Sequence, residues 1–342
     1  MIKKCTIIDI AKHVGVTPST VSRALSDHPG ISEKTRVSVM KAADELGYVR
    51  NLYATLMRKE KTRIVGLIVP EIRNEFFSTV AALLAEFCHK NDFQMAVCTT
   101  GECSDFEEKQ TRALVEARIS GVIISPTEKP SRMTETFLQS IPTIQLSRYA
   151  PGIGGVRFFL DESGGIGAAT EHVLALGHRR IAYVGAHNRH FPGAERLRAF
   201  TDAHAGYGLV PDECLIRLGH ADAEFGRQAV TGLLSGEHGA ERPTAIILGS
   251  MEITAVTLQV IAEKGLRIPQ DISLVGYGDP LWYSLLPTPL TTVHLPIAEM
   301  ALKAVEALFA EMGGQGQTIP SYELPFHSGL VLRQSTRAVS GS

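Results

Sequence analysis

Short apolar runs alternate with longer amphipathic stretches from residue 64 onward, and this alternation limits the fold more than any other feature of the sequence. The apolar runs predict buried strands at 64–69, 94–99, 121–125, 143–146, 180–184, 244–248 and 271–275. Helical spacing predicts helices at 76–90, 105–118, 164–176, 194–206, 223–234 and 253–263. Strands that alternate with helices form a parallel, doubly wound sheet. This region is too long for one such sheet, so two lobes are expected, with a seam near 161–163.

Three short helices are expected within the first fifty residues. The first covers 6–14 and ends at Gly15. The second follows Thr17 and Pro18, which combine an N-cap with a proline at the first helical position, and runs to about residue 25. Ser32 caps the third helix. The inward-facing residues of the third helix are expected to be Val37, Met40, Ala43 and Leu46.

The first two helices and the turn between them fit a helix-turn-helix. Ala11 is small where the two helices must approach each other, and Gly15 allows the tight turn. Arg23, on the outer face of the second helix, has the geometry to donate two hydrogen bonds to guanine, while short hydroxyl side chains suit phosphate or base contacts. The candidate DNA contacts here are Thr6, Thr17, Pro18, Ser19, Thr20, Ser22, Arg23 and Ser26. A three-helix module that docks to another protein is the alternative interpretation.

The charge distribution supports the DNA-binding interpretation. Residues 1–63 hold 12 Lys and Arg against 6 Asp and Glu, whereas the remainder holds 22 against 30. A basic head on an acidic body is typical of a phosphate-binding module joined to a larger domain.

The remaining composition favours a soluble, cytoplasmic protein. The five cysteines are scattered without a CxxC pair, which favours reduced thiols over a zinc or disulfide site. The sequence shows no signal peptide, and no apolar run approaches the length of a membrane span.

Residues 5–58 resemble the DNA-binding headpiece of the LacI/GalR family of bacterial repressors, with a gluconate-repressor-like subgroup as one option. The resemblance continues to about residue 333. It is carried by the stretches GY at 47–48, IVGLIVP at 64–70, NEFF at 74–77, GVIISP at 121–126, LGHRRIAYVG at 176–185, RLRAF at 196–200, IPQDISLVGY at 268–277 and PLTTV at 289–293.

The resemblance implies an N-terminal all-α helix-turn-helix headpiece and an α/β sensor of two lobes, similar to periplasmic binding proteins, with a doubly wound parallel sheet in each lobe. It places the DNA-binding domain at 1–49, a hinge linker at 50–62 and the effector-binding and dimerisation domain at 63–333. Three crossings between lobes, the later two near 289–293 and 321–325, would give lobe 1 residues 63–161 and 293–322, and lobe 2 residues 162–290 and 323–333. The implied partners are a palindromic operator in double-stranded DNA, a small-molecule effector and a second copy of the chain.

The hinge linker of the family forms a helix on DNA and wedges a leucine into a base step of the minor groove. The usual pattern is Pro-Asn-x-x-Ala-x-x-Leu. Here the proline is replaced by Arg50, and the wedge position falls on Met57, one residue after Leu56. Either Leu56 or Met57 is therefore the candidate wedge. The resemblance assigns DNA contacts in the linker to Asn51, Ala54, Leu56, Met57 and Arg58.

The resemblance also assigns an effector pocket between the lobes. Its residues would be Phe77, Ser125, Arg148, Asp161, His190, Arg196, Ser250 and Asp279. Several carboxylates and amides that usually accept hydrogen bonds from sugar hydroxyls are replaced in this chain, while two arginines remain. A pocket with fewer acids favours an anionic effector, such as a sugar acid or another small carboxylate, because a guanidinium is a strong partner for a carboxylate. A neutral sugar is the alternative effector class.

Other functional classes fit less well. GGIG at 164–167 lacks the spacing of a dinucleotide-binding loop, and no motif of a hydrolase, metalloprotease or P-loop enzyme occurs. An enzyme, a metal site and a cofactor are therefore not expected. A solute-binding protein for transport would explain the two lobes but not the basic headpiece. A dimer is favoured over a tetramer, because no heptad repeat follows residue 333.

Overall fold

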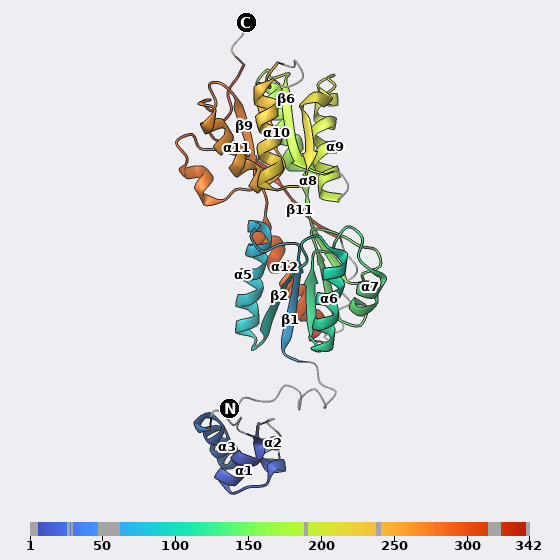
Figure 1. The fold of residues 1–342 in the computed structure, drawn as a ribbon, viewed down its shortest axis with the longest axis vertical. Coiled ribbons are helices and arrows are strands. Elements are labelled where there is room, and N and C mark those ends of the chain that lie inside the picture. Colours follow the sequence, from blue (N-terminus) through green and yellow to red (C-terminus); the bar gives the residue numbers. More distant parts are fainter. Residues whose placement is uncertain are drawn as a thin grey trace. The chain divides into compact units, whose positions relative to one another are not determined.

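The computed structural model describes residues 6–25, 28, 30–46, 62–187, 191–236, 241–313 and 323–339. The chain divides into two compact units, Met1–Lys61 and Thr62–Ser342. The first unit contains the helices α1 (Ile7–Val14), α2 (Pro18–Leu25) and α3 (Glu33–Glu45), shown in blue in Figure 1. Its core consists of the buried side chains of Ile10, Ala11, Val21, Ala24, Val39, Ala42 and Ala43.

The inward face of α3 differs in part from the prediction, which was correct for Ala43 and wrong for Val37, Met40 and Leu46. Val39, Ala42 and Ala43 are buried, and they face α1 and α2. The exposed apolar side chains are Val37 and Met40, each with 57% of its surface accessible, and Leu46 with 36%. The prediction gave the larger apolar residues to the core, but two alanines on one face allow α3 to approach both of its neighbours closely.

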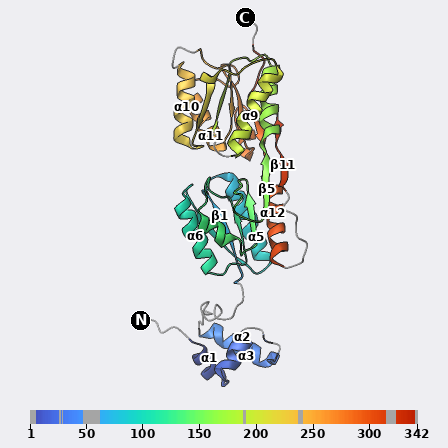
Figure 2. The same ribbon diagram turned by 90° about the vertical axis from the view of Figure 1, so that its right-hand side faces the viewer.

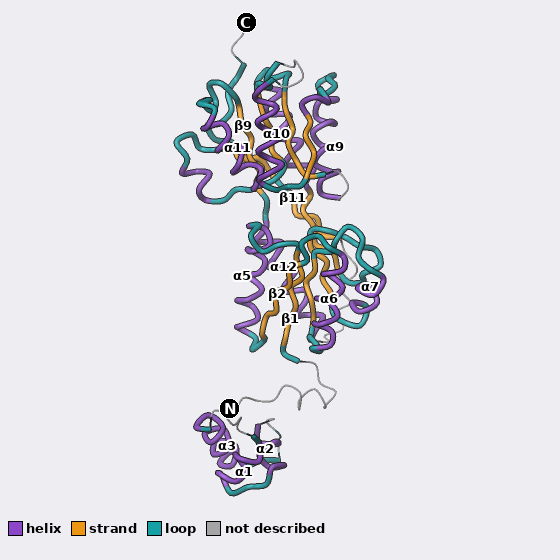
Figure 3. Tube along the Cα trace, in the orientation of Figure 1, coloured by secondary structure: helices purple, strands orange, loops and turns teal. Residues whose placement is uncertain are grey.

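The second unit alternates strands and helices along the chain (Figure 3). Its helices are α5 (Glu75–Lys90), α6 (Ser104–Glu116), α7 (Arg132–Leu138), α8 (Glu162–Ala175), α9 (Phe191–Gly206), α10 (Ala223–Ser235), α11 (Met251–Glu263) and α12 (Ile297–Met312), with the 3-10 helices η1 (Glu213–Leu215) and η3 (Leu281–Leu285). Its strands are β1 (Ile64–Val69), β2 (Gln94–Thr99), β3 (Gly121–Ile124), β4 (Thr143–Leu146), β5 (Val156–Asp161), β6 (Ile181–Ala186), β7 (Ile216–Gly219), β8 (Ala245–Leu248), β9 (Ser273–Tyr277), β10 (Thr291–His294), β11 (Glu323–His327) and β12 (Gly329–Val331).

The strands form two six-stranded sheets, one in each lobe, in the orders β11-β5-β4-β3-β1-β2 and β12-β10-β9-β8-β6-β7. Every pairing is parallel except that of β10 with β12. The central β1 and the corresponding β6 each lie between the next two strands of the chain, which is the order of a doubly wound sheet. The predicted fold class is therefore confirmed.

The later two crossings between the lobes occur farther along the chain than predicted. β10 pairs with β9 of the second sheet, so the second crossing follows His294 and leads into α12, which packs against α5 of the first lobe. β11 pairs with β5 of the first sheet, so the third crossing comes at Ser328. Figure 2 shows β5 and β11 side by side. The prediction placed both crossings too early because the strand pairs that extend each sheet join segments far apart in the sequence.

Candidate DNA-binding helix and effector cleft

Local hydrogen bonds and one glycine fix both ends of α1 and the start of α2. Thr6 and Asp9 form a capping box at the start of α1, in which the Thr6 backbone N–H donates to Asp9 Oδ2 at 2.9 Å and the Asp9 backbone N–H donates to Thr6 Oγ1 at 3.4 Å. Gly15 ends α1 with a φ of 74°, a conformation that suits glycine. The Thr17 hydroxyl then accepts a hydrogen bond from the Thr20 backbone N–H at 3.2 Å, so that α2 begins two residues after the turn.

The helix α2 buries one face and presents the other. Val21 and Ala24 are buried in the headpiece core. The outer face carries Ser22, which is partly buried, together with the exposed Pro18, Ser19 and Arg23. This arrangement is typical of a recognition helix, whose N-terminal residues contact base edges. Of the other predicted DNA contacts, Ser26, Asn51, Ala54, Leu56, Met57 and Arg58 lie outside the described residues.

A cleft lies between the two lobes, at the carboxyl ends of strands from both sheets. It encloses a cavity of about 150 Å³. The lining residues lie at or after the ends of β1, β4 and β5 of the first sheet and of β6, β7, β8, β9 and β10 of the second, or on the helices that begin there. Ligands of doubly wound proteins bind beyond the carboxyl ends of the strands. This cleft is therefore the candidate effector site.

Arg196, on α9, forms the centre of a buried polar network in this cleft. Its Nε and Nη2 donate to the two carboxylate oxygens of Glu162, each at 2.9 Å, and its Nη1 donates to the carbonyl oxygen of Gly249 at 2.7 Å. Its guanidinium carbon lies 4.4 Å from the centre of the Tyr277 ring, and the Tyr277 hydroxyl donates to Glu162. Burial opposes the charge of Arg196, but Glu162 and Tyr277 outweigh that effect and raise its pKa. Burial also raises the pKa of Tyr277, so this hydroxyl stays a donor.

The first lobe contributes a second arginine and an aromatic pair to the cleft. Arg148 donates from Nη1 and Nη2 to the Glu102 carboxylate at 2.6 and 2.7 Å. Phe76 and Phe77, at the start of α5, lie edge to face, with their ring centres 4.9 Å apart. Both arginines therefore have a carboxylate partner within the protein, which the sequence did not predict.

Four of the eight predicted effector residues line the cavity, three described ones do not, and one lies outside the described residues. Phe77, Arg148, Arg196 and Ser250 line the cavity. The other three described residues have their side chains elsewhere. Ser125 is fully buried. The Asp161 carboxylate accepts a hydrogen bond from the Ser163 backbone N–H at the start of α8 and contacts His327, and the Asp279 carboxylate pairs with Arg333 at 2.8 Å. His190 lies outside the described residues.

Several lining residues were missed by the sequence analysis: Asn74, Phe76, Ser147, Glu162, Met251 and Tyr277. Ser147 and Met251 each stand within three residues of a strand's carboxyl end, and Tyr277 is itself the last residue of β9. The position after each predicted strand was thus the available signal. Glu162 directly follows Asp161, but no sequence feature indicated that it would pair with Arg196.

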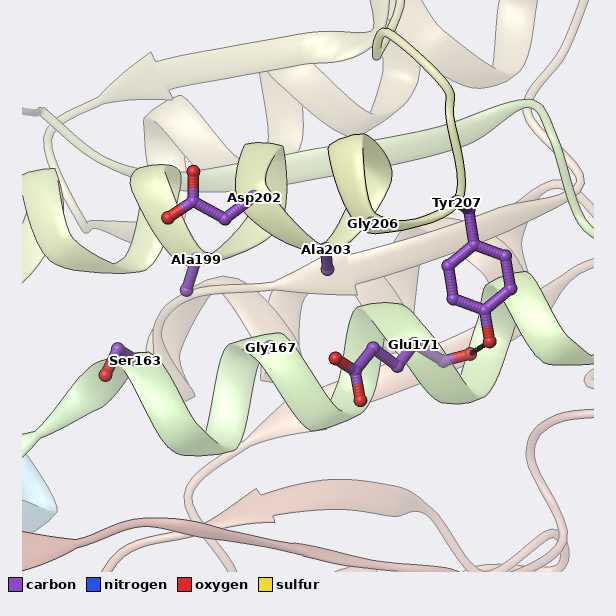
Figure 4. A pocket seen from close by; sticks show the side chains of 8 residues that line it. All are labelled: Ser163, Gly167, Glu171, Ala199, Asp202, Ala203, Gly206 and Tyr207. Carbon is purple, nitrogen blue, oxygen red and sulfur yellow. Dashed lines mark hydrogen bonds between the residues drawn. The ribbon is translucent and has the colours of Figure 1, made fainter.

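A larger cavity, of about 340 Å³, lies between α8 and α9 of the second lobe (Figure 4). Small residues, including Gly167, Ala199 and Ala203, line the space between the two helices. The carboxylates of Glu171 and Asp202 are the charged groups of its lining. All the residues that line this cavity belong to the second lobe, whereas both lobes line the cleft, so the cleft remains the candidate effector site.

The described residues include no group of three or more His, Cys, Asp or Glu side chains that could hold a metal ion. Within the same residues, no helix has the length and apolar character needed to cross a membrane. Cys88, Cys98, Cys103 and Cys214 are free thiols, and burial raises the pKa of Cys88 to about 11.

Comparisons with known proteins agree with both parts of the structure. Residues 6–51 match the model of bacterial regulatory proteins of the lacI family, and residues 170–336 match that of the periplasmic binding protein-like domain. The chain is 28% identical to the HTH-type transcriptional regulator DegA of Bacillus subtilis (strain 168), over 97% of this chain and 98% of the relative. It is also 28% identical to the HTH-type transcriptional regulator GalR of Escherichia coli (strain K12), over 98% and 96% of the two chains.

Solved structures give the same result. The lac repressor dimer bound to operator and the anti-inducer ONPF matches with a TM-score of 0.81 at 25% identity, over 98% of this chain and 100% of that one. A transcriptional regulator of the family from Silicibacter pomeroyi matches with a TM-score of 0.83 at 23% identity, over 97% and 99%. With a helix-turn-helix of the lacI type, a two-lobed sensor and regulators among its relatives along nearly the whole length, the chain belongs to the LacI/GalR family of transcriptional regulators.

Proposed function

We propose that this regulator is a homodimeric repressor that reads a palindromic operator through α2 and responds to a small metabolite held between its lobes. The observation that carries the proposal is the cleft, because the carboxyl ends of strands from both sheets supply its lining. A ligand there contacts both lobes, so its binding energy depends on their relative angle. The two recognition helices of a dimer would enter successive major grooves about 34–36 Å apart.

Operator binding is tested through Arg23, the basic residue on the exposed face of α2. The operator is first selected from random duplexes with the full chain. We expect Arg23→Ala to weaken binding to that operator by about 1–3 kcal/mol and to relax its specificity at the contacted base pairs. Arg227→Ala is the matched control, since Arg227 pairs with Glu263 on the surface of the second lobe. Equal operator affinity for Arg23→Ala and the parent protein would rule out this docking.

The surface that we propose for pairing of protomers includes η3. This short element exposes Leu281 by 78%, Leu285 by 73% and Trp282 by 41%. Large apolar side chains gathered on one exposed element mark an interaction site more often than scattered ones do.

For the effector, the ion pairs of the cleft support the neutral-sugar alternative better than the sugar acid predicted from the sequence. That prediction depended on arginines free to bind a carboxylate, yet Arg148 pairs with Glu102 and Arg196 with Glu162. A neutral polyhydroxylated ligand leaves both pairs intact, because its hydroxyls donate to carboxylate oxygens and accept from the remaining N–H groups. The rings of Phe76 and Phe77 supply apolar surface for one face of such a ligand.

A thermal-shift screen tests the effector class with matched pairs, each a neutral sugar and the acid of the same carbon skeleton. A ligand at 100 times its Kd stabilises the folded state by about 2.7 kcal/mol. We expect stabilisation by a neutral member and not by its acid. Each stabilising compound is then added to the operator-binding assay, where an effector changes affinity by about 1–3 kcal/mol in one direction or the other. Stabilisation confined to acids would restore the anionic class.

A further inference from the structure

Glu162 occupies an unusual place for a charged residue. It is the first residue of α8, directly after β5 ends at Asp161, and only 3% of its side chain is exposed. Its two carboxylate oxygens accept hydrogen bonds from Arg196, and one of them also accepts from the Tyr277 hydroxyl. A carboxylate in such a position is stable because its charge is compensated within the protein.

Arg196 has few donors left for a ligand. A guanidinium carries five N–H groups. Two of those in Arg196 donate to Glu162 and a third donates to Gly249, while one face of the group lies against the Tyr277 ring. The edge formed by Nε and Nη2, which would bind a carboxylate with two parallel hydrogen bonds, is already filled.

An anionic effector would therefore meet one of two obstacles. If it displaced Glu162 from Arg196, it would leave a buried carboxylate without its counterion. If it bound beside Glu162, two negative charges would share one guanidinium. A neutral ligand meets neither obstacle.

Among the described residues that line the cleft, Arg148 is the one other cationic side chain. Arg148 is held by Glu102 in the same bidentate manner. Near the cleft, burial and the neighbouring carboxylates of Glu252 and Glu102 raise the pKa of Glu71, as expected where acidic groups gather.

We infer that Glu162 is a specificity-determining residue, a resident counterion of Arg196 that restricts the cleft to uncharged effectors. Its removal would turn the same place into a binding site for small carboxylates. The inference rests on the proposed function, in which the cleft binds the effector.

The test is chemical rescue of Glu162→Ala in the full chain, with acetate as the probe and chloride at equal ionic strength as the reference. This variant removes the carboxylate and opens the space that it filled. We expect its Tm to rise progressively with acetate concentration, as for any ligand that binds only the folded state. The Tm of the parent protein is expected to be the same in acetate and chloride.

Two further variants complete the design. Glu263→Ala removes the carboxylate partner of Arg227 on the surface, where water replaces it, and is expected to show no response to acetate. Glu162→Gln preserves the side-chain volume if the alanine variant does not fold, and is expected to respond to sugar acids that leave the parent unaffected. The proposal is wrong if neither Glu162 variant responds to a carboxylate, or if acetate stabilises the parent protein and Arg196→Gln abolishes that effect.

The results separate the two proposals. A parent protein that binds its operator, combined with Glu162 variants that ignore carboxylates, refutes the role of Glu162 and leaves the repressor intact. Rescue of Glu162→Ala by acetate, combined with a parent protein that binds no operator, would support the role of Glu162 and refute the repressor function.

Discussion

Replacement of Arg196 by methionine is the sharpest test of the network in the cleft. Methionine retains much of the apolar stem but removes the guanidinium, and with it two hydrogen bonds to Glu162 and one to Gly249. The Glu162 carboxylate, with 3% of its side chain exposed, then keeps the Tyr277 hydroxyl as a partner but loses its counterion.

The expected loss follows from that burial. Removal of one partner from a buried ion pair costs about 3–5 kcal/mol, because the other charge stays desolvated without compensation. Domains unfold with about 5–15 kcal/mol, so Arg196→Met should still fold in the absence of denaturant but with a large part of its stability lost. The double variant Arg196→Met/Glu162→Gln leaves no buried charge and should recover much of the difference.

The assay is urea unfolding of the full chain, followed by circular dichroism. Arg227→Met is the matched control, because its pair with Glu263 is exposed on both sides and is expected to contribute far less. If Arg196→Met cost no more than Arg227→Met, or if the double variant were as unstable as the single one, the reasoning from burial would be refuted.

Three further predictions concern the sensor. Burial lowers the pKa of His178 below its ordinary 6.5, so the unfolded state binds a proton before the folded state does as the pH falls. The urea midpoint of the parent protein should therefore decrease below pH 6.5. The decrease should be less steep in His178→Gln. Gly155 has a φ of +96°, and an added Cβ would lie 1.8 Å from the carbonyl oxygen of Thr143. Gly155→Ala should therefore lose more than the roughly 1–3 kcal/mol of backbone strain alone, as measured by urea unfolding. Leu281→Lys should dissociate the dimer in sedimentation experiments, whereas Val210→Lys, at a site 90% exposed, should not.

The fold could be predicted from the sequence where the pattern is local. β1 and β4 were found with the bounds that the structure gives, because each is a short apolar run that is complete within its own segment. β5 and β11 were missed. β11 is the edge strand of its sheet, and its pairing is with β5, more than 150 residues away in the sequence, while β5 lies between β11 and β4. The headpiece was correct as a set of helices, but the rotation of α3 was not, because packing of small residues outweighed side-chain size.

The candidate site shows the same division. Arg196 was found because it belongs to a recognisable motif, and its position in the cleft followed from the fold. The prediction of an anionic effector counted Arg196 as free, and only the structure brings Glu162 to it from 34 positions away in the sequence. A charge count along the chain identifies the ionic residues of a pocket, but the pairs that they form depend on where the helices begin.

The position of Glu162 also suggests how ligand binding reaches the DNA-binding part of the chain. Glu162 begins α8 immediately after β5, one of the three segments that connect the lobes, and Asp161 at that junction contacts His327 at the end of β11. A ligand that hydrogen-bonds to Glu162 and Arg196 contacts the second lobe, and if it also packs against Phe77 it contacts the first lobe as well. Its affinity therefore differs between lobe angles, and a difference in affinity between two states is what shifts their populations. In the dimeric repressor that we propose, a change in lobe angle would alter the spacing of the two linkers, and so the fit of two recognition helices to one operator.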